Sequence, residues 1–311
     1  MTLLQEARPN DPVTCPIEEL SGRSWWRRFF GVTRRLRERS DWAQFAGADW
    51  AEHIMQTPIT DDFHAKQGRS TGRWVLEHAG RMLSVYLKRH YRLPWWQGVM
   101  AALWPRGDWS PALQEFHHLR WAHDQGLPVP RVVAAGEYLQ PLGRLQSFLA
   151  IEELTGMLPL HQAISQASRH LEPSAFRRWK AGLAREMARL TRFLHHRHYF
   201  HKDLYLCHFY IPRADTWAIP EWQGRVHMID FHRLGHHPLT SVWWRIKDLG
   251  QLLFSSAIAG VDVRDRLRFW RYYLQPDHRR GARWLTWCVL QRGARYRRHN
   301  AKKKTNHGIL S

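Results

Sequence analysis

The sequence contains little cysteine. Only Cys15, Cys207 and Cys288 occur among its 311 residues. Because these three residues are far apart and odd in number, they exclude a disulfide framework and a zinc site built on cysteines. We therefore expect a reducing, cytoplasmic setting for this chain.

Long apolar runs are missing as well. No stretch approaches twenty uncharged apolar residues, so the sequence predicts no transmembrane helix. The first residues, 1–8, lack a basic region followed by an apolar core and predict no cleaved secretory signal. The composition is nevertheless 44% hydrophobic with 18 Trp, which is enough for a large core and excludes wholesale disorder. The length suits one two-lobed domain or two small ones.

Acidic residues are scarce relative to basic ones. Asp and Glu number 27 against 47 Lys and Arg, which gives a formal net charge of +20. Eight of the basic residues are lysines, so the other 39 are arginines, whose flat fork of donors matches phosphate and carboxylate oxygens. This charge predicts a polyanionic partner: nucleic acid, an anionic membrane surface or a phosphorylated glycolipid. The alternative is a basic surface that is merely solvated.

The first half of the chain has the alternation of strands. Residues 73–78 and 82–88 predict two strands joined by a turn at Ala79-Gly80. Apolar residues at helical spacing predict a helix over 111–124, ended by Gly126 and Pro128. Two more strands are expected over 131–135 and 145–152.

The second half has the periodicity of helices. Helices are expected over 172–198, 241–259 and 263–274. A strand-rich first part followed by a helical second part predicts an α+β, two-lobed architecture. The join between the two parts is expected near Glu152-Glu153-Leu154.

A polar segment after the first long helix carries the sharpest signal. His201-Lys202-Asp203 is followed about 20 residues later by a short strand that ends in Asp230. This is the order of a kinase catalytic loop and a metal-binding Asp. Phosphoryl transfer needs one carboxylate to accept the proton of a hydroxyl group and another to hold magnesium against the phosphates. Asp203 suits the first role and Asp230 suits the second.

The first half supplies candidates for the remaining parts of such a site. Lys88 ends a strand of Val-x-Leu-Lys pattern, similar to the strand lysine that reaches the α and β phosphates. Glu115, on the following helix, is expected to pair with Lys88, the alternative being a solvated Glu. The segment 68–73, with Gly68 and Gly72, precedes the strand pair and is expected to cover the phosphates, although it lacks a third glycine.

These motifs resemble the lipopolysaccharide kinase (Kdo/WaaP) family, and within it the lipopolysaccharide core heptose(I) kinases. The resemblance runs from about Phe63 to about Tyr273. The segments that carry it are 68–71, 86–90, 115–119, 126–130, 147–149, 152–154, 201–209, 229–233 and 244–249. It implies a protein-kinase-like fold with a strand-rich N-lobe and a helical C-lobe. It also implies ATP with Mg2+ as cofactors and a sugar hydroxyl of the lipopolysaccharide inner core as acceptor.

The resemblance assigns roles to single residues. Asp203 would be the catalytic base, Asp230 the magnesium ligand, and Lys88 the phosphate-binding lysine positioned by Glu115. Backbone groups near Glu153 and Leu154 would bind adenine.

Three other residues would complete the catalytic region. His201 and Asp248 would support the catalytic loop. His208 stands where protein kinases place a magnesium-binding Asn, and it is a candidate metal ligand. Imidazole is a poor ligand for magnesium, however, so contact with phosphate or acceptor is the alternative. Asp230 is followed by Phe231-His232, and no glycine-hinged activation switch is expected.

Composition and the motifs together divide the chain into four parts. Residues 1–50 are expected to form a basic, aromatic extension, seated at a membrane interface or packed as a helix on the body. Residues 51–152 would form the nucleotide-binding N-lobe, 153–291 the catalytic C-lobe, and 292–311 a mobile basic tail. An enzyme built in this way would act at the cytoplasmic face of the inner membrane, as a peripheral protein.

Rival interpretations start from the same residues. A Kdo kinase or another small-acceptor phosphotransferase would share the catalytic loop. A pseudokinase would bind lipopolysaccharide or membrane without catalysis, but Lys88, Asp203 and Asp230 are all present. A nucleic-acid binder would use only the basic surface, and no recognised motif supports it. The histidines at 195, 196, 198 and 201 are expected to serve packing and the helix end, with zinc binding as the lesser alternative.

Overall fold

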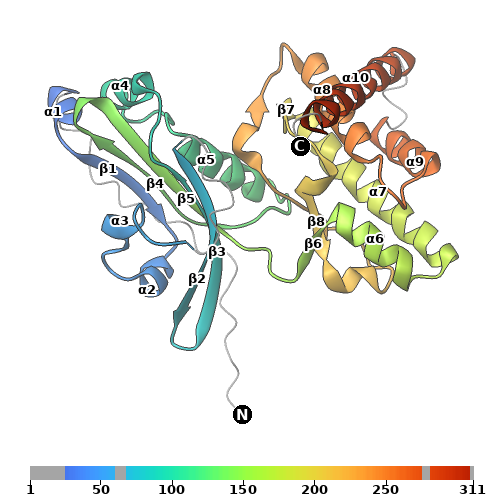
Figure 1. Ribbon diagram of the computed structural model, residues 1–311, viewed down its shortest axis with the longest axis horizontal. Coiled ribbons are helices and arrows are strands. Elements are labelled where there is room, and N and C mark those ends of the chain that lie inside the picture. The colour runs from blue at the N-terminus through green and yellow to red at the C-terminus, as the bar shows by residue number, and fades with distance from the viewer. Residues whose placement is uncertain (1–24, 60–67, 275–280, 309–311) are drawn as a thin grey trace. The chain divides into compact units, whose positions relative to one another are not determined.

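A computed structural model describes residues 25–59, 68–274 and 281–308 (Figure 1). The chain divides into two compact units. Unit 1 comprises residues 1–121 and 130–155, and unit 2 comprises residues 122–129 and 156–311. The expected sequence of a strand-rich part and a helical part is present, and the fold mixes helices with antiparallel sheets.

Unit 1 is built on a five-stranded antiparallel sheet. The strand order is β1 (Thr33–Glu38), β4 (Val132–Gln140), β5 (Arg144–Glu152), β3 (Arg81–His90) and β2 (Arg69–His78). Strands β2 and β3 form a hairpin whose turn, Ala79-Gly80, has positive φ at both residues, as the tightest hairpin turns require. The turn therefore lies where the sequence predicted it.

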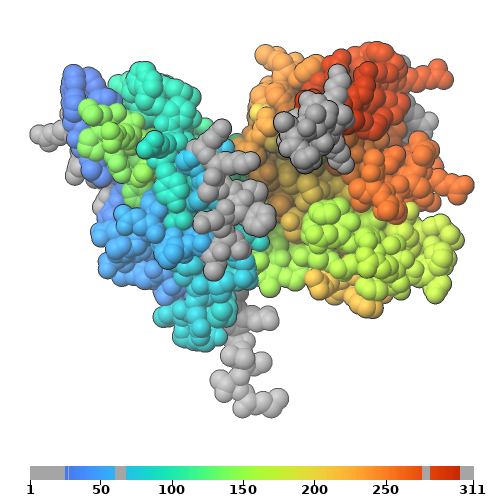
Figure 2. Space-filling view, in the orientation of Figure 1, coloured from blue at the N-terminus to red at the C-terminus, as the bar shows by residue number. Residues whose placement is uncertain are grey.

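Unit 1 also contains helices, most of them short. They are α1 (Trp25–Phe30), α2 (Trp42–Ala46), α3 (Trp50–His53), α4 (Trp95–Leu103) and α5 (Pro111–Asp124). Helices α1 and α4 contact the short turn Pro141–Gly143 between β4 and β5. In Figure 2 these three segments gather at one end of unit 1. Gly98 of α4 permits this approach, since a Cβ there would lie 1.8 Å from the carbonyl oxygen of Gly143.

Residues 33–50 differ from their expected place in an extension. Strand β1 pairs with β4 along its whole length. Trp42, Phe45 and Trp50 are buried in the same core cluster as Leu87 and Phe148, so this segment is part of the sheet domain.

Strand β1 was not predicted because four of its six residues are charged. Its sequence, Thr-Arg-Arg-Leu-Arg-Glu, has a single large apolar residue, Leu36. Arg35 is satisfied by tertiary contacts, because its guanidinium donates to the carbonyl oxygens of Pro105 and Gly107, each at 2.7 Å. Residues 1–24 of the expected extension lie outside the described residues.

Unit 2 is mainly helical. Its long helices are α6 (Leu160–His170), α7 (Pro173–His196), α8 (Ser241–Ser255), α9 (Val263–Leu274) and α10 (Ala282–Gly308). A small sheet has the order β6 (Met157–Pro159), β8 (Phe209–Pro212), β9 (His227–Met228), and β7 (Tyr199–Phe200) pairs with β10 (Gly235–His236). Helix α7 buries the apolar face that its periodicity predicted, including Trp179, Leu183 and Leu190.

The basic C-terminal segment also differs from expectation. Helix α10 continues through residue 308, whereas a mobile tail was expected from residue 292. Its N-terminal half is anchored, because Leu285 and Val289 are buried against α8 and α9. Glycines allow the close crossing with α8: a Cβ at Gly250 would lie 2.7 Å from Cγ of Arg292. Helix α10 thus crosses the boundary drawn from composition.

None of the helices in the described part of the chain is both long and apolar enough to span a bilayer.

Burial of residues 42–50 leads to a prediction about stability. Trp42 is 0% exposed, so Trp42→Ala should lower the free energy of unfolding of unit 1 by about 3–5 kcal/mol. Trp26→Ala is the control, because Trp26 lies in the same expected extension but is 54% exposed, and its loss should cost less than about 0.5 kcal/mol. Urea unfolding followed by circular dichroism measures both. Equal, small effects would mean that residues 33–50 are a dispensable extension.

Candidate active site

The loop that carries Asp203 is held by a buried carboxylate on helix α8. Asp248 is fully buried, and its two oxygens accept hydrogen bonds from the backbone N–H groups of His201 and Lys202, each at 2.8 Å. Lys202 has a φ of +66°, a conformation that costs a non-glycine residue energy and therefore needs such fixing. Asp248 thus fixes the backbone of the loop at His201 and Lys202.

A second residue of the same helix completes this support. The side-chain amide of Gln251 donates to the carbonyl of Lys202 at 3.1 Å and to the hydroxyl of Tyr205 at 3.2 Å. Its oxygen accepts from the N–H of Leu204 at 3.2 Å. Asp248 and Gln251 are one turn apart, so one face of α8 fixes the loop from 201 to 205.

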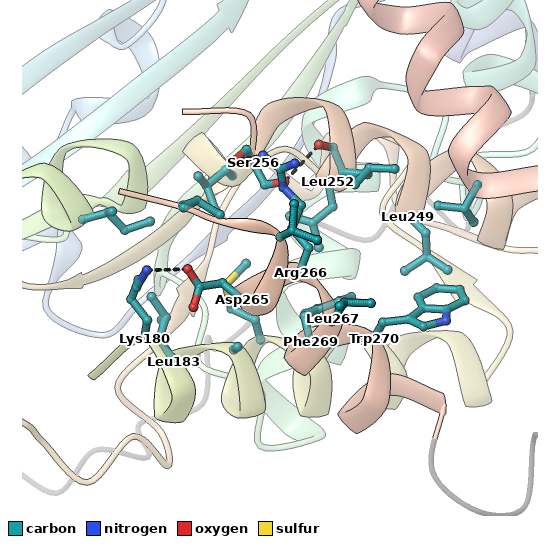
Figure 3. A pocket seen from close by; sticks show the side chains of 18 of the residues that line it. Lys180, Leu183, Leu249, Leu252, Ser256, Asp265, Arg266, Leu267, Phe269 and Trp270 are labelled. Carbon is teal, nitrogen blue, oxygen red and sulfur yellow. Dashed lines mark hydrogen bonds and ion pairs between the residues drawn. The ribbon is translucent and has the colours of Figure 1, made fainter. Parts of the chain in front are cut away.

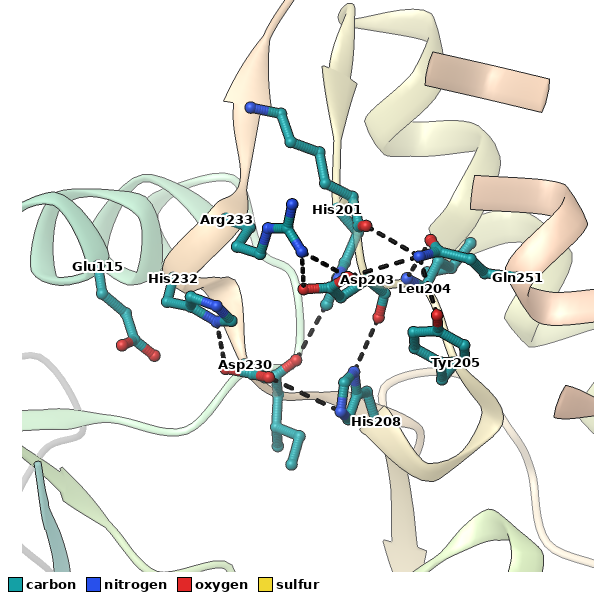
Figure 4. A network of polar contacts seen from close by, with 12 residues as sticks. Glu115, His201, Asp203, Leu204, Tyr205, His208, Asp230, His232, Arg233 and Gln251 are labelled. Carbon is teal, nitrogen blue, oxygen red and sulfur yellow. Dashed lines mark hydrogen bonds and ion pairs between the residues drawn. The ribbon is translucent and has the colours of Figure 1, made fainter. Parts of the chain in front are cut away.

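Asp203 points out of this loop toward a cation. Nη1 of Arg233 lies 3.1 Å from both carboxylate oxygens of Asp203, and Gln251 approaches one of them at 3.4 Å (Figure 4). The Asp203 side chain is 16% exposed, so it can still be reached from solvent. The guanidinium of Arg233 therefore orients the carboxylate of Asp203 by contacting both of its oxygens.

Asp230 follows strand β9 in a left-handed conformation, with φ of +67°. One of its oxygens lies 2.6 Å from Nδ1 of His232, and the other lies 3.7 Å from Nε2 of His208. Figure 4 shows Asp203, His208 and Asp230 in the same network. The sequence-predicted catalytic and metal-binding candidates of unit 2 are therefore brought together.

His208 links the two carboxylate positions. Its Nδ1 donates to the backbone carbonyl of Asp203 at 2.8 Å. Burial by itself lowers the pKa of His208, but contact with Cys207, the bond to Asp203 and the charge of Asp230 together raise this pKa above its usual value. A protonated imidazole has no lone pair for a metal, so these contacts favour His208 as a charged hydrogen-bond donor.

His201 is a structural residue of the loop. It is fully buried, and its Nε2–H donates to the carbonyl of Ile229 at 2.9 Å, which ties the loop to the residue before Asp230. Burial lowers the pKa of His201, so the ring is neutral at pH 7.

Two of the predicted site residues lie in unit 1 and form an ion pair there. Nζ of Lys88, on β3, is 2.8 Å from Oε1 of Glu115, on α5. The Glu115 side chain is only 4% exposed, so its charge is strongly coupled to the lysine. The expected pair is therefore present, and a solvated Glu115 is excluded.

The expected adenine-binding residues, Glu153 and Leu154, differ in whether their backbone N–H and carbonyl groups already form hydrogen bonds. The N–H of Glu153 already donates to Ser84 at 2.8 Å, and its carbonyl accepts from Thr155 at 2.8 Å. Its carboxylate is bound to Arg73. Among the described residues, the N–H and carbonyl of Leu154 make no backbone hydrogen bond, so Leu154 has the better groups for adenine.

The expected glycine loop is wrong in its secondary structure. Residues 69–78 form strand β2, and Gly72 pairs with Leu87 inside the sheet. Ser70, Gly72 and Leu76 alternate on the buried face, and the small size of the first two conceals this alternation from a hydrophobicity pattern. Only Gly68, with φ of +74°, lies outside the strand.

Asp230 is the residue of this network whose side chain suits a magnesium ion. No three His, Cys, Asp or Glu side chains in the described parts of the chain are grouped to hold a metal, which includes the histidines near 195–201. Magnesium keeps several waters and needs only one or two carboxylates beside substrate phosphates, so Asp230 fits it. The imidazole of His208 does not.

Sequence reasoning missed two residues of this site. Arg233 was part of a quoted motif but received no role, although it binds Asp203 directly. Gln251 was overlooked, although its position three residues after Asp248 on a predicted helix was an available signal.

Comparison with known proteins supports the family inferred from the motifs. Residues 60–273 match the Lipopolysaccharide kinase (Kdo/WaaP) family. The chain is 31% identical over 209 residues to the lipopolysaccharide core heptose(I) kinase WaaP of Pseudomonas aeruginosa, covering 67% of this chain and 75% of the relative. It is 31% identical over 161 residues to the protein of the same name from Escherichia coli (strain K12), covering 51% and 58%.

A solved structure is also similar. It is described as WaaP in complex with acyl carrier protein, and it matches with a TM-score of 0.62 and 25% identity. The match covers 84% of this chain and 98% of that chain.

The brace on the loop gives a second prediction. Asp248→Ala leaves two backbone donors without a partner, and we expect it to lower the free energy of unfolding by about 3 kcal/mol. Asp248→Asn keeps one acceptor oxygen and should cost less. Hydrogen exchange at the amides of His201 and Lys202 should accelerate in both variants.

Glu221→Gln is the matched control, because Glu221 is an exposed carboxylate of the same unit. If Asp248→Ala exchanged these two amides no faster than Glu221→Gln does, Asp248 would not be the brace.

Proposed function

Because the chain belongs to the lipopolysaccharide kinase (Kdo/WaaP) family, we propose that it transfers the γ-phosphoryl group of ATP to a heptose hydroxyl of the lipopolysaccharide inner core. The relatives named above are phosphotransferases of this kind by name. The observation that carries the proposal is the carboxylate of Asp203, held by Arg233 on a loop that α8 fixes.

In this proposal each unit has one task, as the N-lobe and C-lobe of a protein-kinase-like fold. Unit 1 holds ATP: Lys88, positioned by Glu115, binds phosphate oxygens, and backbone groups of Leu154 bind adenine. Unit 2 supplies the base and the metal ligand.

The chemistry assigned to unit 2 is a proton transfer coupled to phosphoryl transfer. Asp203 accepts the proton of the sugar hydroxyl as that oxygen bonds to the γ-phosphorus and the bond to the β-phosphate oxygen breaks. Arg233 and Gln251 hold the carboxylate in position. Magnesium, when bound at Asp230, neutralises charge on the phosphates.

We assign an anionic membrane surface as a partner, since the acceptor is a glycolipid. The end of unit 1 formed by α1, α4 and the turn at Pro141–Gly143 exposes large apolar side chains. They are Trp25, Trp26, Phe30, Trp95, Trp96, Trp104 and Leu142. Arg106 and Arg144 are exposed in or beside the same segments. Tryptophans with arginines suit the interface of an anionic leaflet, which agrees with a peripheral location at the cytoplasmic face of the inner membrane.

We also propose acyl carrier protein as a partner, because the similar solved structure is a complex with it. Unit 2 contains an apolar cavity of about 330 Å3 between α7, α8, α9 and α10 (Figure 3). Leu183, Leu249, Leu252 and Phe269 line it, and the ion pair of Lys180 with Asp265 lies at one side. Such a lining suits a fatty acyl chain.

The proposed kinase activity predicts separable losses. Asp203→Asn should reduce transfer at least about 100-fold while ATP still binds, because only the proton acceptor is lost. Lys88→Met should weaken ATP binding and also reduce turnover. The measurement is transfer from labelled ATP to lipopolysaccharide that lacks core phosphate, with mass spectrometry to locate the added group. Phosphate on Kdo instead of heptose would correct the acceptor, and absence of ATP binding by the wild type would contradict a kinase.

The cavity gives a separate prediction. Ala184→Trp fills the space beside Leu183 and should weaken binding of acylated carrier protein about 10-fold or more, without changing binding of the unacylated form. Ala257→Leu, at an exposed position, is the control. Equal binding of both forms by the wild type would remove the acyl chain from the proposal.

A further inference from the structure

Three cationic side chains gather beside Asp203, and we call Lys202, Arg233 and Lys247 the basic cluster. Nζ of Lys202 lies 4.9 Å from the ring centroid of Trp244, and Nζ of Lys247 lies 4.8 Å from the same centroid. Arg233 binds both oxygens of Asp203. The three residues come from the loop at 201–205, from the turn at Phe231–Arg233 and from α8, so tertiary folding assembles the cluster.

Nearby carboxylates neutralise this cluster only in part. Asp248 is fully buried and already accepts the N–H groups of His201 and Lys202, while Asp203 is paired with Arg233. Neither Lys202 nor Lys247 forms a salt bridge with another described residue.

The lysines also repel their cationic neighbours. Burial, followed by the charges of Lys247 and Arg233, lowers the pKa of Lys202. Burial, followed by the charge of Arg233, lowers the pKa of Lys247. Half-buried cations that repel one another gain energy when an anion binds among them.

The surroundings hold these cations in place. A Cβ at Gly235 would lie 2.5 Å from Nζ of Lys202 and 2.8 Å from Nε2 of His237, so the missing side chain makes room for both. The His237 ring stacks on Trp244 at 4.9 Å. Its buried Nε2 has no hydrogen-bond partner among the described residues. The cluster is therefore preorganised but incompletely satisfied.

We propose that the basic cluster binds an anionic group of the acceptor, a carboxylate or a phosphate, beside the hydroxyl that receives the phosphoryl group. This inference rests on the proposed function, because the hydroxyl must come within hydrogen-bond distance of Asp203. Arg233 touches Asp203, so an anion held by the cluster belongs to the same part of the acceptor molecule. The cluster then selects acidic glycolipids over neutral sugars, through charge-assisted hydrogen bonds.

This inference is tested by a double-mutant-type cycle, in which a protein variant is combined with a chemically modified acceptor. Lys247→Met removes one charge and keeps an unbranched stem over Trp244. It should raise KM for the intact acceptor about 10-fold with little change in kcat, as expected for a lost charge-assisted hydrogen bond. The wild type should show a similar rise with an acceptor whose acidic-sugar carboxylate is reduced to an alcohol. The two changes together should be no worse than either alone, because they remove the same contact.

Two further arms identify the anion and control for charge. If the changes in KM are non-additive with an acceptor stripped of its lipid phosphates, and additive with the reduced acceptor, the anion is a phosphate. Arg271→Met removes an exposed charge from α9 and should leave KM unchanged. Additive losses in both acceptor cycles would overturn the inference. So would a rise in KM for ATP alone, or an equal effect of Arg271→Met.

Direct binding separates this inference from the proposed function. Binding of the intact and the reduced glycolipid is measured without ATP, for the wild type, Lys247→Met and Lys202→Met. Weaker binding of the intact form by both variants supports the cluster even if no transfer occurs, in which case the kinase proposal alone fails. The variants also bind the reduced form more weakly if the anion is a phosphate. Unchanged binding by both variants would refute the cluster whether or not transfer is observed.

Discussion

The candidate catalytic site depends on the carboxylate of Asp248. This fully buried group accepts the N–H groups of two consecutive residues, His201 and Lys202, the second of which is in a left-handed conformation. Burying a carboxylate is unfavourable unless hydrogen bonds replace its water, and these two bonds do so. The same two bonds fix the backbone of the loop, and this fixed backbone determines the direction in which the side chains of Lys202 and Asp203 point.

Helix α8 therefore connects the chemistry to the helical core of unit 2. Its Asp248 and Gln251 face the loop, while Leu249 packs in the cluster that includes Tyr273 and Val289. Lys247 of the same helix belongs to the basic cluster, and the ring of Trp244 lies beneath both of its lysines. A single helix thus positions the proposed base and the proposed anion-binding groups, so any shift of α8 would alter both.

The arginine excess has an internal use as well as an external one. Arg89 is only 5% exposed and donates to the carbonyls of Ile54 and Thr57, at 3.1 and 2.7 Å. Arg35 does the same for Pro105 and Gly107. Arginine suits this task because its rigid fork satisfies several carbonyls at once. Part of the net charge is therefore structural, and the charge available to a polyanion is smaller than the composition implies.

The sequence by itself determined the elements whose signal is local. Periodicity located α5, α7 and α9 and the hairpin of β2 and β3, since burial of one face imposes a repeat on neighbouring residues. The order of Asp203 and Asp230, with Lys88 before them, indicated a kinase, and the motifs at 201–209, 229–233 and 244–249 were sufficient to name the family.

Only the tertiary structure decided the contacts between distant residues. In strand β1, Arg35 donates to carbonyl oxygens about 70 residues away. The sequence alone does not show these acceptors, so the arginines of this strand resemble those of a solvated surface. The pairing of Arg233 with Asp203 and the gathering of Lys202 and Lys247 around Trp244 likewise join segments that no local pattern connects. The physical reason is that an ionic or polar contact requires only proximity in space and leaves no repeat in the sequence.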